Sequence, residues 1–194
     1  IIKSGVTVLY SVTQSEAIKE IQLKAASEHA KLVSIDAEAD WFVSEETLAG
    51  TSLSVYTSTD EYHVLHVGLP GAHQVRNAVL ALLAAELLAS NLKISSDHIA
   101  EGLARVSALS GLKGRLEVMQ EEPLVVLDVG HNLDGVRAAL AFLAGVLAER
   151  QGRLYIMFGT MRDKNVYQIA KLLSEAGASV YLPTINSDRA IPSQ

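Results

Sequence analysis

The chain has 194 residues, of which 49% are hydrophobic and 20% charged, with a formal net charge of -6. This balance is typical of a globular protein, argues against disorder, and makes nucleic acid a poor candidate for the main partner. The absence of cysteine excludes a disulfide framework, a zinc–thiolate site and a thiol nucleophile. No signal peptide is visible, and the most apolar segment, residues 78–89, is shorter than the ~18 residues of a membrane span. We therefore expect a cytoplasmic protein that binds no membrane.

The beginning of the chain predicts a parallel strand–helix–strand unit. Residues 6–10 and 31–35 have the composition of short strands. Between them, Thr13 followed by Glu16 fits a capping box that opens a helix to about residue 30. The acidic stretch that follows, residues 36–40, is expected to be a surface loop.

A hairpin and a long apolar helix come next. Residues 53–57 and 61–67 alternate between apolar and polar side chains, which predicts two antiparallel strands. The helix after them is apolar nearly all round, which predicts that it is buried. Asn77, one turn into this helix, would then need partners for its two donors and its acceptor. An adenine edge would supply them, although neighbouring backbone groups are the more common partners.

A boundary between two domains is expected near residue 110. Ser96 or Asp97 caps a helix to about Val106, and residues 107–114 then contain two glycines and two serines. The predicted domains are residues 1–110 and 111–194. Arg115 follows this stretch, where its planar guanidinium could reach a phosphate, unless it is simply a surface residue.

The second half of the chain predicts a doubly wound α/β arrangement with right-handed crossovers. Strands and helices alternate in it, and Asp163 is a plausible N-cap and Gly177 a stop signal for its second helix. The predicted strands are 124–127, 154–158 and 179–182, and the predicted helices are 136–147 and 166–176.

Polar residues gather directly after the first of these strands. Residues 124–127 are apolar and half β-branched, which suits a strand buried on both faces of a parallel sheet. Asp128, His131 and Asn132 follow at the carboxyl end, the edge of such a sheet where ligands bind. Asp and Asn are also common turn residues, so the pattern alone fits a ligand site or a plain turn.

Three stretches taken together carry a family resemblance. The first stretch is Gly71-Ala72-His73-Gln74 with Asn77. The second is Gly114-Arg115 with Asp128-Val129-Gly130-His131-Asn132, and the third is residues 158–164. The set resembles folylpolyglutamate synthase of the Mur ligase superfamily, which is often bifunctional with dihydrofolate synthase. The resemblance extends over the whole chain. The family often has Gly-Ala where Val129-Gly130 stand, so we expect the backbone geometry of this loop to differ from that of the family.

The resemblance implies a fold and a reaction. The fold would be the later part of a Mur-ligase-like central ATPase domain (residues 1–110) followed by a Rossmann-like, doubly wound ligase domain (111–194). ATP would phosphorylate a carboxylate of folate, and the amine of L-glutamate would displace phosphate from the acyl phosphate. By the same resemblance, Asn77 would hold the adenine, Arg115 the phosphates and Asp128 the ribose, with His131 near the glutamate or the transferred phosphate.

The resemblance also implies parts that this sequence does not contain. The family's phosphate loop, magnesium ligands and modified lysine would lie upstream of Ile1, so no metal ligand is assigned here, and the full-length enzyme would be a monomer. We therefore expect no ATP turnover by the 194 residues alone, which phosphate release with folate, glutamate and magnesium would test. The alternatives are a peptidoglycan Mur ligase and a non-catalytic nucleotide-binding module; the missing glycine-rich phosphate loop favours the latter.

Overall fold

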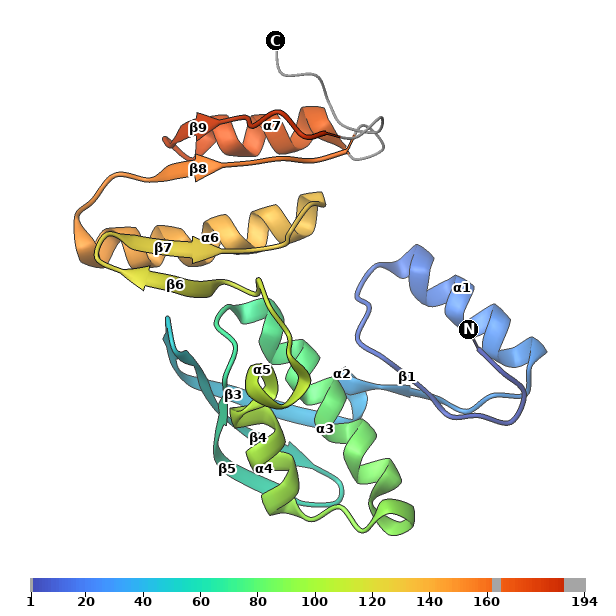
Figure 1. The fold of residues 1–194 in the computed structure, drawn as a ribbon. Coiled ribbons are helices and arrows are strands. Elements are labelled where there is room, and N and C mark those ends of the chain that lie inside the picture. Colours follow the sequence, from blue (N-terminus) through green and yellow to red (C-terminus); the bar gives the residue numbers. More distant parts are fainter. Residues whose placement is uncertain (1, 162–164, 187–194) are drawn as a thin grey trace. The chain divides into compact units, whose positions relative to one another are not determined.

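The structure, a computed structural model, describes residues 2–161 and 165–186 and has a mixed α/β fold (Figure 1). The predicted α/β class is confirmed. The chain forms two compact units, residues 1–112 and 113–194, which are described separately below.

The first unit begins with the predicted parallel strand–helix–strand motif. Strand β1 (Val8–Tyr10) pairs in parallel with β2 (Leu32–Ser34), and α1 (Ser15–Ser27) connects them. The predicted capping box is wrong, because the N-cap lies one residue later than expected. Gln14 occupies its N-cap without a side-chain hydrogen bond, and the Ser15 hydroxyl donates to Glu16 instead.

A three-stranded antiparallel sheet in the order β3-β4-β5 follows. Strands β4 (Gly50–Thr57) and β5 (Glu61–Val67) form the predicted hairpin, whereas β3 (Ala39–Thr47) was not predicted. The loop expected at residues 36–40 is wrong as to its backbone, although Asp36, Ala37, Glu38 and Asp40 are exposed as expected. Short helix α2 (Ile35–Glu38) stands there, and Ile35 is completely buried. Strand β3 lies at the sheet edge with mostly exposed side chains, so its sequence carries little apolar alternation.

Helix α3 (Ala72–Leu92) covers this sheet with one face. Val79 and Leu82 are buried in the same core as Leu53 and Val55 of β4. The prediction of a helix buried all round is wrong, because Leu92 and its neighbours near the C-terminal end are exposed. With 21 residues, α3 is the one described helix whose length and composition would suit a membrane span. Its packing on a sheet is the alternative explanation of its apolar composition.

Two short helices complete the unit. Helix α4 (Ser96–Ala104) is capped by Ser95, whose hydroxyl accepts from His98 N while the Ser95 amide donates to His98 Nδ1. The cap thus lies just before the two predicted positions. Helix α5 (Val106–Ser110) occupies much of the stretch expected to be a flexible connection, and Gly111 ends it with φ 70°.

Arg76 on α3 ties several of these elements together. Its guanidinium donates to both carboxylate oxygens of Asp36 at 2.8 and 2.7 Å and to the Ser11 carbonyl at 2.9 Å, and it lies 5.5 Å from the Trp41 ring. The hydrogen bond from Arg76 lowers the pKa of the Asp36 carboxyl. The bidentate pair fixes the start of α3 against α2, and the bond to Ser11 adds the loop after β1.

This pair predicts a pH dependence of stability. Because the folded-state pKa of Asp36 is lowered, its contribution is complete above the unfolded-state value near 3.9 and is lost as the pH falls through the folded-state pKa. We expect Asp36→Asn to reduce the free energy of unfolding at pH 7 and to flatten its fall below pH 4. Urea titrations at several pH values would test this. Parallel curves for the variant and the parent would contradict it.

The second unit alternates strands and helices as predicted, with one additional strand. Its elements are β6 (Glu117–Glu121), β7 (Leu124–Leu127), α6 (Leu133–Arg150), β8 (Tyr155–Met157), α7 (Val166–Glu175) and β9 (Ser179–Tyr181). Strand β6, the unpredicted one, pairs antiparallel with β7, and β8 pairs in parallel with β9. Val136 of α6 and Ile169 and Leu173 of α7 form the core.

Two predictions for the second unit concern the N-cap of α7 and the burial of β7. Asp163, the expected N-cap of α7, lies outside the described residues; Asn165 occupies the N-cap, and Gly177 follows the helix with φ 64°. The prediction that residues 124–127 are buried on both faces is wrong for the described part of the chain. Val125 and Leu127 are 44% and 47% exposed.

Candidate functional site

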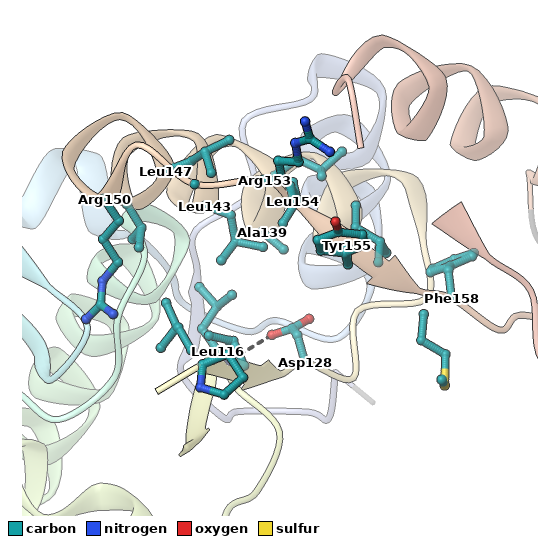
Figure 2. A pocket seen from close by; sticks show the side chains of 18 of the residues that line it. Leu116, Asp128, Ala139, Leu143, Leu147, Arg150, Arg153, Leu154, Tyr155 and Phe158 are labelled. Atoms are coloured by element: carbon teal, nitrogen blue, oxygen red, sulfur yellow. Dashed lines mark hydrogen bonds between the residues drawn. The ribbon is translucent and has the colours of Figure 1, made fainter. Parts of the chain in front are cut away.

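The turn after β7 is built around the Asp128 carboxylate. Its Oδ1 accepts from the Gly130 amide at 2.6 Å, and its Oδ2 accepts from the Leu116 amide at 2.9 Å. Figure 2 shows the second of these bonds as a dashed line. A carboxylate offers about four acceptor positions, so Asp128 can hold both loops and still accept from a ligand.

The segment from Gly114 to Leu116 is fastened to this turn. Gly114 O accepts from the Val129 amide at 2.9 Å, and Gly114 N donates to the Glu117 carboxylate at 2.8 Å. Gly114 has φ 65°, and a Cβ here would lie 2.6 Å from Val129 Cγ1, so only glycine fits. Hydrogen bonds from the Gly114 amide and the Lys113 ammonium lower the pKa of Glu117.

Arg115 lies between these anchored neighbours. Its own side chain is half-buried, and none of the residues that the structure describes pairs with its guanidinium. Leu116, directly after it, is 1% exposed with φ 51°, an unusual conformation for leucine that the bond to Asp128 holds in place. The two stretches that the sequence singled out, around Arg115 and Asp128, therefore form one hydrogen-bonded structure.

His131 presents its imidazole to solvent from the same turn. Its Nδ1 lies 3.0 Å from the Val129 carbonyl oxygen. Because a carbonyl can only accept, Nδ1 carries the proton and neutral His131 has the lone pair on Nε2. The buried Thr160 hydroxyl donates to His131 O at 3.4 Å, which joins the loop after β8 to the loop after β7. No feature of the sequence indicated this contact.

Asn132 has a structural role in the same turn. Its Oδ1 accepts from the Gly135 amide at 2.7 Å, which makes it the N-cap of α6. The turn at 128–132 thus stands at the positive end of an 18-residue helix, a position that favours anions.

Asn77 belongs to the first unit and differs from its predicted setting. It is exposed rather than buried, and the buried amide of this helix turn is Gln74, which is 6% exposed. Asn77 Nδ2 donates to Gln74 Oε1 at 3.1 Å, and Gln74 Nε2 lies 2.9 Å from His73 Nε2. Gln74 therefore orients the Asn77 amide. No described residue donates to Asn77 Oδ1.

The second unit also contains a pocket of about 560 Å³ between β7, β8 and α6. Asp128 and Gly130 are among its lining residues, with apolar side chains of β7, β8 and α6 and charged residues that precede the two strands; Figure 2 labels Asp128 and several of the others. Arg115 and His131 do not line it. Of the predicted site residues of the second unit, only Asp128 therefore lines the pocket. Within residues 2–161 and 165–186, no group of three His, Asp or Glu side chains could hold a metal ion.

Comparison with known proteins matches residues 114–194 to the family described as Mur ligase, glutamate ligase domain. Dihydrofolate synthase/folylpolyglutamate synthase of Bacillus subtilis is 31% identical over 98% of the chain and 43% of its own length. The ADP complex of Mycobacterium tuberculosis folylpolyglutamate synthase superposes with TM-score 0.82 and 26% identity, covering 95% of the chain and 40% of that protein. UDP-N-acetylmuramyl-tripeptide synthetase of Leifsonia xyli is 32% identical over 70% of the chain and 26% of its length.

These matches confirm the resemblance inferred from the three sequence stretches. The chain spans less than half the length of the relatives that it matches. The roles of Asn77, Arg115, Asp128 and His131, and the assignment of the two units as Mur ligase domains, stay predictions.

Proposed function

We propose, because residues 114–194 match the family described as Mur ligase, glutamate ligase domain, that the protein containing this chain is an ATP-dependent ligase that adds L-glutamate to folate. The observation that carries the proposal is the hydrogen-bonded pairing of the Arg115 segment with the Asp128 turn. This pairing sets the backbone on either side of Arg115 against the Asp128 turn, which stands at the positive end of α6.

The reaction proceeds in two steps. A folate carboxylate oxygen attacks the γ-phosphorus of ATP, which gives an acyl phosphate and ADP. The amine of glutamate then attacks the acyl carbon, loses a proton, and displaces phosphate as the amide forms. Both steps bring anions together, so the requirement is positioning and neutralisation of charge rather than covalent catalysis by the protein.

The residues of this chain have separate roles in the proposal. The Arg115 fork binds phosphate oxygens, and Asp128 accepts from the ribose hydroxyls while it keeps its two backbone bonds. Asn77 offers an amide oriented by Gln74 to the adenine edge. His131 Nε2 accepts a proton or a hydrogen bond from the glutamate amine or stands near the transferred phosphate.

Several properties of the whole enzyme belong to the same proposal. We assign it to the cytoplasm and expect a monomer that also uses dihydropteroate if the enzyme is bifunctional. ATP is used with magnesium, but the described residues offer no fitting cluster, so no step above is assigned to a metal ligand of this chain.

The experiment compares substrates on the full ligase polypeptide. We expect ATP hydrolysis to depend on a folate together with glutamate, and radiolabelled glutamate to appear in the folate product. UDP-muramyl peptides should give no stimulation. Stimulation by those peptides alone would instead support the peptidoglycan ligase, whose relative in Leifsonia xyli has comparable identity over a shorter part of the chain. Binding of nucleotide with no turnover on any substrate would support a non-catalytic module.

Arg115 allows a sharper test of the proposed site. Arg115→Lys keeps the positive charge but removes the planar fork, so we expect kcat/KM for ATP to fall by about 100-fold. Arg137→Lys is the matched control, because Arg137 is exposed and pairs only with Asp134 at 3.2 Å among the described residues. Equal kcat/KM values for the two variants would contradict a role of Arg115 in binding phosphate.

A further inference from the structure

The start of α3 carries Asn77, and this helix start has weak local support. Its N-cap is Gly71, which has φ 101° and no side chain with which to cap the helix. The Gln74 amide donates to the Gly71 carbonyl at 2.9 Å and closes the first turn. A helix start without a side-chain cap frays easily, because its first amides have no partner within the helix. The position of the backbone that carries Asn77 therefore depends on contacts with other elements.

Arg76, the residue directly before Asn77, makes such contacts with two other elements. Its guanidinium donates to both carboxylate oxygens of Asp36 in α2 and to the carbonyl of Ser11, the first residue after β1. Asp36 itself stands two residues after the end of β2. In open α/β sheets, ligands bind outside the carboxyl ends of the strands. Arg76 thus joins the start of α3 to the edge of the β1–β2 pair where a ligand is expected.

The geometry of this contact matters more than its charge. The side chains of Arg76 and Asp36 are 30% and 46% exposed, and ion pairs this accessible to water contribute little through charge alone. A planar fork with three acceptor atoms at 2.8, 2.9 and 2.7 Å, however, restricts how the elements that carry them are arranged. The Trp41 ring, 5.5 Å from the guanidinium carbon, adds a cation–π contact. The contact is therefore better suited to fixing a position than to adding stability.

We propose that Arg76 is a positioning residue for the nucleotide: through Asp36 and Ser11 it fixes the turn of α3 from which the Asn77 amide reaches the adenine. This inference rests on the proposed function, and in particular on the proposed role of Asn77. Gln74 determines which way the Asn77 amide faces, whereas Arg76 determines where the helix turn that carries this amide lies. The guanidinium is occupied by Asp36 and Ser11, so its effect on the adenine passes through Asn77.

Hydrogen exchange of the 194-residue chain tests the structural part of the inference without any nucleotide. In Arg76→Ala, we expect the backbone amides of residues 75–78 to exchange at least about fivefold faster than in the parent, while those of residues 82–88 keep their rates. Arg105→Ala is the matched control, because Arg105 is an exposed arginine of the same unit that pairs with Glu101 at 2.7 Å. It should change neither set. Unchanged exchange at residues 75–78 in Arg76→Ala would overturn the proposal, and so would equal acceleration along the whole helix.

A double-mutant cycle in the full ligase polypeptide tests the effect on the nucleotide. We expect Arg76→Ala to raise KM for ATP about tenfold and to leave kcat at saturating ATP within about twofold. In an Asn77→Ala background, the same change should raise KM by less than about twofold, because the amide that Arg76 positions is then missing. A tenfold effect that persists without Asn77 would indicate a general disturbance of the site and would overturn the proposal.

The result for Asn77→Ala alone distinguishes this inference from the proposed function. If that variant leaves KM for ATP unchanged, the proposed role of Asn77 is wrong and this inference is wrong with it. If it raises KM while Arg76→Ala does not, only this inference is wrong. Arg76→Lys keeps the charge but not the planar fork, so we expect a smaller rise in KM, about threefold, with the same dependence on Asn77. This variant replaces Arg76→Ala in the cycle if the alanine variant does not fold.

Discussion

Replacing Asp128 by alanine is expected to affect both stability and nucleotide binding. The variant loses the bonds from the Leu116 and Gly130 amides and leaves two backbone donors unpaired in a half-buried turn. Hydrogen bonds to a charged acceptor contribute about 1.5–3 kcal/mol each, so we expect the free energy of unfolding to fall by about 2–4 kcal/mol. Urea denaturation of the parent and variant chains would measure this loss.

The effect of Asp128→Ala on nucleotide binding distinguishes the proposed role of Asp128 in binding ribose from its structural role. If the carboxylate also accepts from the ribose hydroxyls, KM for ATP in the full ligase should rise about 100-fold under conditions where the variant is folded. In the parent enzyme, a deoxyribose analogue of ATP should have a higher KM than ATP, because it lacks a hydroxyl that Asp128 accepts from. In the variant, the two KM values should be similar. Asp134→Ala, at an exposed position six residues later, should change neither quantity by much. An unchanged KM for ATP with reduced stability would leave Asp128 a purely structural residue.

Gly50→Ala is expected to destabilise the first unit severely. A Cβ at this position would lie 2.2 Å from the Val67 carbonyl oxygen and 3.0 Å from the His66 ring, and the backbone has φ 145°. Val67 is buried in the core, so its carbonyl cannot move without disturbing the pairing of β4 with β5. The combined clash and backbone strain should reduce the free energy of unfolding by more than about 3 kcal/mol.

The matched control is Gly102→Ala in α4, where a Cβ meets nothing within 4 Å. Alanine is a better helix former than glycine, so this change should stabilise the chain by about 0.5–1 kcal/mol. Thermal or urea unfolding of the two variants beside the parent would show opposite shifts. A stable Gly50→Ala protein would mean that the β3–β4 turn has a different backbone from the one described.

The sequence predicted the helices and strands that have a strong apolar periodicity. It missed the strands that are defined by hydrogen bonds to a neighbouring strand. The hairpin at β4 and β5 and the alternation of strands and helices after Gly114 follow from apolar periodicity. Strand β3 has no such period, because its side chains are mostly exposed and its identity depends on hydrogen bonds to β4. Strand β6, another edge strand, was missed for the same reason.

The residues of the candidate site stay predictions, and the structure adds their contacts. The rule that ligands bind at the carboxyl ends of strands pointed to Asp128, whereas only the family resemblance grouped Arg115 with it. The sequence could not reveal that the Asp128 oxygens already hold two amides, since this depends on the unusual backbone of Leu116. Nor could it place Asn77 at the surface, because a long apolar helix looks the same whether one face or all faces are covered.

The bonds that fasten Gly114 and Leu116 to the Asp128 turn make the connection between the two units short. From Gly114 onward the backbone is cross-linked to the body of the second unit. On the other side, α5 ends at Ser110 and Leu112 still packs against the core of the first unit. If Arg115 and Asp128 bind a nucleotide as proposed, both contacts come from one unit, on backbone segments that are already joined to each other.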